Sequence, residues 1–179
     1  TKLGLRAGEV KNFAIAISQE FGNLSEFSQT TANAFAQLSL TTGITGDSAA
    51  KLAKSIQIIQ GGTLDSNINT IELFGNLAKA ARVAPADVLN DMAESTETFA
   101  KFADEGGENL AKAAIEARKL GLELKDVDAI AESLLDFEAS IEKQMEASVL
   151  IGRQLNLERA RELSLAGDLE GVLAEVKNQ

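Results

Sequence analysis

Oxygen-bearing side chains alternate at Asp65, Asn67 and Asn69, the closest approach to a metal-binding motif in this sequence. They match the first, third and fifth positions of a calcium-binding loop. The sixth position needs glycine for a sharp turn and is Thr70, and the twelfth needs a bidentate glutamate and is Asn76. Such a loop cannot close around the ion, so we expect these residues to lie at a helix N-terminus.

A glycine-rich segment, Gly43-Ile44-Thr45-Gly46, invites comparison with phosphate-binding loops. No Gly-Lys-Ser/Thr sequence follows it or either Gly-Gly pair, and no strand pattern precedes them, which excludes a P-loop. We expect these glycines to terminate helices.

Four carboxylates at helical spacing, Glu132, Asp136, Glu138 and Glu142, could suggest acid–base catalysis or a dimetal helix bundle. Bundles of that kind need Glu-x-x-His, and the chain contains neither His nor Cys. No Ser/His/Asp or Cys/His set can be assembled either. We therefore expect a solvated helix face here, no metal or other cofactor, and no enzymatic activity.

The composition favours helices as the elements that carry these residues. The 179 residues include one Pro, many Ala and no Trp or Tyr, and apolar residues recur at spacings of three and four. This pattern predicts an all-α fold of consecutive antiparallel helical hairpins, a helix bundle or short helical array, with about eight or nine helices. A core of small side chains stabilises only modestly at about 25 cal/mol per Å² of buried apolar area, so we expect help from other subunits or other parts of a longer chain.

Charge restricts the classes of partner. The net charge of −10 argues against direct nucleic-acid binding and against anchoring to an anionic membrane surface. No apolar run approaches the length of a membrane span.

Glycine-containing breaks divide the chain into three parts within one continuous helical region of a larger chain. Residues 1–60 hold the N-terminal helices, residues 61–119 the middle hairpins, and residues 120–179 a long amphipathic helix with a C-terminal helical hairpin.

A spacing of 39 residues separates three dipeptides, Gly43-Ile44, Arg82-Val83 and Gly121-Leu122. Each precedes a capping residue and an Ala-rich helix, and a degenerate fourth copy is expected at 154–158. Two interpretations stay open: a true repeat, or turns that any array of hairpins produces at similar intervals.

A heptad-like seam organises the stretch from Leu120 to Val149, which we expect to form one long helix after a short turn. Its apolar members are Val127, Ile130, Leu134, Phe137, Ile141 and Met145. Such a seam packs against neighbouring helices of the same chain or against another molecule. We expect the first for most members. Self-association stays open for Phe137, Ile141 and Met145, which lie beyond the reach of the helix at 110–119 at about 1.5 Å of rise per residue.

Several short sequence motifs in the segment 116–176 resemble those of a known protein family. They are Leu120-Gly121-Leu122, Leu134-Leu135-Asp136-Phe137-Glu138, the segment 142–145, Leu155-Asn156-Leu157-Glu158-Arg159-Ala160, and Leu165-Ala166-Gly167-Asp168-Leu169. This segment resembles parts of bacteriophage tail length tape measure proteins, and residues 35–101 are similar to the repetitive Ala-rich body of the same family.

The resemblance implies a structural protein of a phage tail or tail-like particle, a helical ruler that sets tail length inside the tail tube. It implies location in the virion tail after assembly in the bacterial host cytoplasm. It implies further copies of the chain, usually three, and tail-tube or baseplate-hub proteins as partners. The chain is shorter than a ruler and would be one segment, without a membrane role. A soluble helical adaptor that binds a partner helix along residues 127–145 is the alternative from another class.

Overall fold

This computed structural model describes residues 7–25 and 27–179, which fold into helices joined by short connections. The elements are α1 (Ala7–Phe21), α2 (Gln29–Thr42), α3 (Gly46–Gln60), α4 (Leu64–Ala80), α5 (Pro85–Glu94), α6 (Thr96–Phe102), a 3₁₀ turn η1 (Glu105–Gly107), α7 (Glu108–Lys119), α8 (Leu124–Leu135), α9 (Phe137–Ile151), α10 (Glu158–Leu165) and α11 (Leu169–Asn178). The described part of the chain is therefore all-α, as its composition predicted.

The described residues form eleven α-helices, more than the expected eight or nine, because two of the expected helices are each divided into two. Between Pro85 and Phe102, where the apolar spacing predicts a single helix, the chain divides at Ser95 into α5 and α6. The seam helix divides at Asp136, where φ is −78° and ψ is 83°. The Asp136 side chain accepts a hydrogen bond from the Ala139 amide at 3.3 Å and so caps a new helix, α9.

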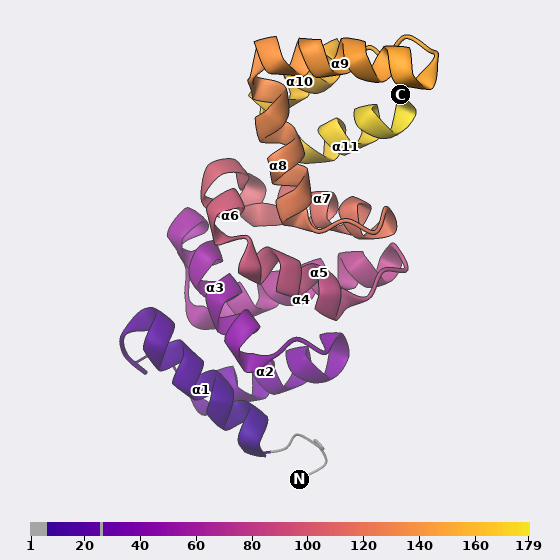
Figure 1. Ribbon diagram of the computed structural model, residues 1–179. Helices are drawn as coiled ribbons and strands as arrows, with labels where there is room; N and C mark the ends of the chain where they lie inside the picture. The colour runs from indigo at the N-terminus through magenta and orange to yellow at the C-terminus, as the bar shows by residue number, and fades with distance from the viewer. Residues whose placement is uncertain (1–6, 26) are drawn as a thin grey trace.

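The helices stack in two rows rather than as simple hairpins. In the first row α1 packs on α3, and α3 packs on α5; in the second row α2 packs on α4, and α4 packs on α7. At the C-terminal end α10 packs on α8 and α11 packs on α7. Figure 1 shows the resulting stack, which rises from α1 and α2 at one end to α9, α10 and α11 at the other. Helices next to each other in sequence are thus not always the main packing partners: α2 packs on α4 far more than on α3.

The 39-residue spacing sets where helices begin. The helices α1, α3, α5 and α8 begin at Ala7, Gly46, Pro85 and Leu124, each 39 residues after the one before. Equivalent positions are also apolar on the inner face, where Ala49, Val88 and Val127 are fully buried. A true 39-residue repeat and an array of hairpins with similar intervals would both give these regularly spaced helix starts.

A left-handed turn precedes three of these helices. Gly43, Arg82 and Gly121 have φ values of 79°, 61° and 76°. After Arg82, the Val83 amide bonds to the Ala78 carbonyl at 2.9 Å, which closes the end of α4 in the manner of a Schellman motif. The positive φ explains why glycine stands at two of the three positions, and it leaves Arg82 in a backbone conformation that costs free energy.

The expected fourth copy of this turn, at residues 154–158, was wrong. Residues 154–157 are an irregular connection between α9 and α10, and the left-handed positions after Gly121 are Gly152 and Gly167, outside this segment. The insertion of α9 after α8 displaces the pattern.

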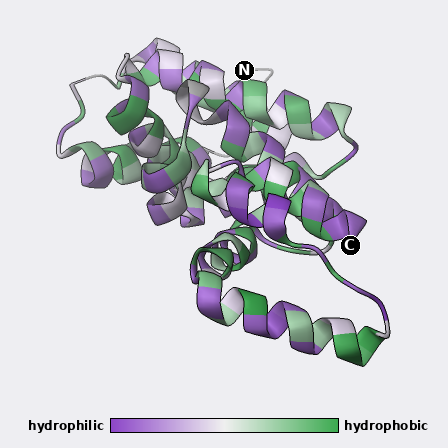
Figure 2. Cartoon of the chain, turned by 90° about the horizontal axis from the view of Figure 1, so that it is seen from above, coloured by the Kyte–Doolittle hydropathy of each residue, from purple (hydrophilic) through white to green (hydrophobic). Residues whose placement is uncertain are grey.

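A single main core crosses the boundaries between the three expected parts. The cluster of buried side chains extends from Phe13 in α1 to Leu173 in α11, and a smaller cluster joins Leu134, Ala160 and Val172. Figure 2 shows hydrophobic and hydrophilic residues alternating along the helices, as expected for amphipathic helices. None of the described helices is both long and apolar enough to cross a bilayer.

Candidate interaction surface

The residues of the calcium-like pattern lie in the first turns of α4. Thr63 caps this helix by accepting a hydrogen bond from the Ser66 amide at 3.2 Å. Asn67 is buried and donates its side-chain amide to the Ala53 carbonyl of α3 at 3.4 Å. Within the described residues, no group of three or more acidic side chains could hold a metal ion. The pattern at 65–69 thus serves helix packing.

The four candidate acid–base carboxylates occupy separate structural positions. Glu132 on α8 pairs with Lys101 of α6 at 2.6 Å, and this hydrogen bond raises the pKa of Lys101. Asp136 caps α9. Glu138 and Glu142 are exposed on α9. The fold does not bring the four together around a reacting group.

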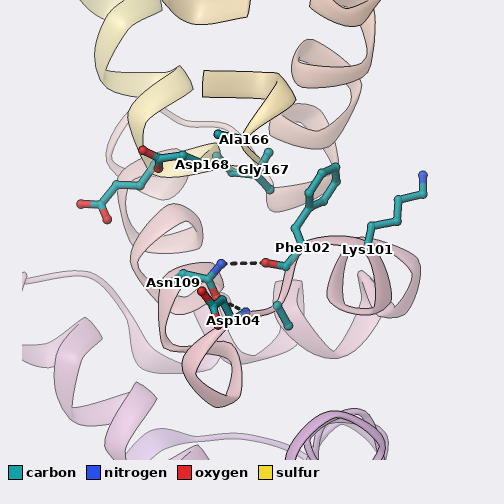
Figure 3. Close-up of a pocket in the computed structure, with 10 residues that line it drawn as sticks. Lys101, Phe102, Asp104, Asn109, Ala166, Gly167 and Asp168 are labelled. Atoms are coloured by element: carbon teal, nitrogen blue, oxygen red, sulfur yellow. Dashed lines mark hydrogen bonds between the residues drawn. The ribbon is translucent and has the colours of Figure 1, made fainter. Parts of the chain in front are cut away.

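A half-open cavity of about 420 Å³ lies between the α6–α7 connection and the α10–α11 turn (Figure 3). Its polar wall is largely engaged in the fold's own hydrogen bonds. Asn109 donates to the Phe102 carbonyl at 2.7 Å and accepts from the Asp104 amide at 3.0 Å. Asp168 caps α11, and the Lys101 side chain extends away from the cavity. The cavity therefore offers no set of convergent polar groups to a small ligand.

The seam residues on α8 face the interior. Val127 is fully buried in the main core, and Leu134 is buried in the smaller cluster. Ile130 is partly buried and packs against that smaller cluster. The partners of this half of the seam are other helices of the same chain.

The seam residues on α9 face solvent. Phe137, Ile141 and Met145 expose 44%, 48% and 65% of their surface, and Val149 continues the same side of the helix with 81%. Residues four apart lie along one side of an α-helix, so these four side chains form a continuous apolar row. We call them the α9 apolar row.

A polar side of α9, about 100° around the helix from the apolar row, contacts the rest of the chain. Ser140, Gln144 and Ser148 also recur every four residues. The Gln144 side chain donates to the Leu155 carbonyl at 2.8 Å, and the Ser148 hydroxyl accepts from the Leu155 amide at 3.0 Å. The helix therefore has the reverse of the usual arrangement, in which apolar residues face the protein and polar residues face water.

Arg161 of α10 is the centre of this polar contact. It is buried, donates from Nε to the Ser140 hydroxyl at 2.9 Å, and donates from Nη2 to Gln144 Oε1 at 2.7 Å. It forms no ion pair with any residue that the structure describes. Its charge is thus stabilised by neutral hydrogen-bond acceptors, which hold α9 on α10.

Sequence reasoning missed this polar contact. The three polar residues of α9 recur at a spacing of four, and each stands one residue before a member of the α9 apolar row. Their regular spacing was a usable signal, because it shows a second row beside the apolar one. Nothing in the sequence, however, indicated that Arg161 would meet them.

Fold and surface together define a stacked all-helical array with one outward-facing apolar helix. Comparisons with family models, with curated proteins and with solved structures found no match for this chain.

Proposed function

We propose that this chain is a structural segment of a bacteriophage tail or tail-like particle, a region of a tape measure protein that acts through protein contacts and not as an enzyme. The phrases within residues 116–176 that resemble that family support the proposal. The observation that carries it is the exposed α9 apolar row, because a helix that turns its apolar side outward is suited to assembly.

In this setting the partners are tail-tube or baseplate proteins and further copies of the chain, in a threefold or other oligomer. The location is the virion tail after assembly in the host cytoplasm. The 39-residue pattern supports a ruler role, since it would let units be added or lost without changing the helix register.

Removal of one unit tests this function. An in-frame deletion of residues 46–84 in the parent gene joins Thr45 to Pro85 and preserves the spacing of the remaining helices. If the unit is extended as helix in the tail tube, the tail should shorten by about 59 Å, from about 1.5 Å per residue, and a duplication should lengthen it equally. Electron micrographs give both lengths. Unchanged length together with unchanged assembly for both variants would exclude the ruler role.

An adaptor that binds a partner helix is the second candidate, and the reversed arrangement of α9 favours it. Its binding surface cannot be the whole stretch 127–145, because Val127 and Leu134 are buried. It would be restricted to α9. A native mass that shows a stable monomer, together with unchanged tail length and assembly after the deletion, would favour the adaptor over the tail segment.

A further inference from the structure

We propose that the α9 apolar row binds an amphipathic helix from another protein, one that carries a row of Lys or Arg beside its own apolar stripe. This inference rests on the proposed function only in taking α9 as a contact surface. It adds the chemistry of the partner and excludes a second copy of this chain from this site.

The size of the surface suits a single helix. The α9 apolar row extends from Phe137 to Val149, about 18 Å at about 1.5 Å of rise per residue. Leu150 and Ile151 extend the exposed apolar surface at the C-terminal end of α9. Apolar anchors at four-residue spacing match the repeat of an amphipathic partner helix, which inserts its own anchors at similar intervals.

An acidic row beside the apolar one sets the charge of the partner. Glu138, Glu142 and Glu146 each follow a member of the apolar row by one residue, so they line one flank of it. All three are exposed, and none forms an ion pair with any described residue. A partner with cations at the facing positions would supply three charge pairs along one edge, which favour that partner over neutral or acidic ones.

A second copy of the chain does not meet this requirement. In an antiparallel pair of α9 helices related by a twofold axis, each flank meets the same flank of the copy, which would place the acidic rows against each other. A parallel pair would place the acidic row against Ser140, Gln144 and Ser148, and that side is already occupied by contacts to Arg161 and Leu155. The net charge of −10 adds a further repulsion between copies. Copies of this chain would therefore associate through other surfaces.

The surface is formed before binding. The hydrogen bonds from Arg161 and the connection after α9 hold the helix through its polar side, so the apolar row does not have to rearrange to become available. A preorganised site loses less conformational entropy when a partner binds.

Two matched peptides test the proposal. Each is a helix of about 18 residues with Leu at alternating spacings of three and four and one Trp in the apolar stripe; one peptide has Lys along a flank and the other has Glu. The chain lacks Trp and Tyr, so Trp fluorescence reports the peptide alone. The Lys peptide should bind at least about tenfold more tightly than the Glu peptide, and its affinity should fall as salt is added. Equal affinities would overturn the proposal.

Variants locate the binding site. Ile141→Ser with Met145→Ser should weaken the Lys peptide about tenfold or more, and Glu142→Gln with Glu146→Gln should weaken it less and reduce its salt dependence. Leu40→Ser, at an exposed apolar residue of α2, is the matched control and should change nothing. All replaced side chains are exposed, so circular dichroism should show an unchanged fold. An equal loss in Leu40→Ser, or no loss in the α9 variants, would count against the site.

Two other occupants are outcomes of the same test. Sedimentation of the free chain with and without Ile141→Ser shows whether α9 mediates self-association; a dimer lost on this substitution would overturn the proposal. Binding to zwitterionic vesicles that depends on Ile141 and exceeds binding to the Lys peptide would also overturn it, in favour of a membrane surface. Neither result depends on tail length. The inference can therefore fail while the proposed function stands, and the proposed function can fail while the inference stands.

Discussion

Asp91 of α5 and Arg118 of α7 form a bidentate ion pair that joins the two rows of helices. Arg118 donates from Nε to Asp91 Oδ2 at 2.6 Å, and from Nη2 to Oδ1. The Asp91 side chain is 4% exposed and that of Arg118 is 28% exposed. At the equivalent positions of α1 and α3, 78 and 39 residues earlier, stand Phe13 and Leu52, both fully buried. A carboxylate therefore occupies a core position of the pattern, and Arg118 compensates its burial.

Removal of Arg118 should leave this carboxylate without its partner. We expect Arg118→Met to lower the free energy of unfolding by about 2–3 kcal/mol near pH 7, somewhat below the range for fully buried pairs because Arg118 is partly exposed. Urea unfolding followed by circular dichroism measures it. Lys101→Met, which breaks an exposed pair with Glu132, is the control and should have little effect. Similar losses in both variants would show that the burial of Asp91 does not matter.

The pH dependence of stability should carry the signature of Asp91. Burial raises the pKa of this carboxyl above its ordinary value of 3.8, and the opposing effect of Arg118 does not cancel the shift. The folded state thus holds the proton more tightly than the unfolded state. The stability that this group contributes is full below pH 3.8 and is lost as the pH rises through the raised pKa.

Comparison with Asp91→Asn isolates this contribution, because asparagine does not titrate. The unfolding free energy of the native chain minus that of Asp91→Asn should fall as the pH rises from below 3.8 and then become constant. Urea titrations at several pH values measure the difference. A difference that increases with pH would mean that pairing with Arg118 outweighs burial.

Two of the left-handed turns should respond in opposite directions to substitution. Arg82→Gly should stabilise the chain by about 0.5–1 kcal/mol, because glycine adopts the φ of 61° without strain. Gly121→Ala should destabilise it by about 1 kcal/mol; an added Cβ meets no atom within 4 Å, so the cost is conformational. Gly8→Ala, inside α1 and also without a close contact, should instead stabilise. Thermal unfolding distinguishes the three, and a stabilising Gly121→Ala would contradict the assigned turn.

The two halves of the seam should differ in their effect on stability. Leu134→Ala should cost about 2–3 kcal/mol, because it opens the small buried cluster with Ala160 and Val172. Ile141→Ala should cost much less, about 0.5–1 kcal/mol in the isolated chain, because 48% of this residue's surface is exposed and it belongs to neither buried cluster. Chemical denaturation measures both. A large cost for Ile141→Ala would place α9 against the core and contradict its outward orientation.

Local signals in the sequence marked where several helices end, since Gly43 and Gly61 lie directly after α2 and α3. Asp168 follows Gly167, accepts a hydrogen bond from the Gly171 amide at 2.8 Å and caps α11. At α3 and α4 the caps are Thr45 and Thr63, and the acidic residues Asp47 and Asp65 follow them by two positions. Both aspartates lie in the first helical turn, where their charge complements the helix dipole, so sequence alone could not separate a cap from a first-turn carboxylate.

The sequence by itself determined the helical class, the glycine-marked turns and the 39-residue spacing, because these depend on backbone preferences and on apolar periodicity within about one helix. The tertiary structure alone decided which side of each helix is buried. It ended α8 at Asp136, turned the polar row of α9 onto Arg161 and left Ile141 and its neighbours in solvent. Those choices depend on contacts between residues distant in sequence, and local periodicity is the same whether an apolar row faces the core or a partner.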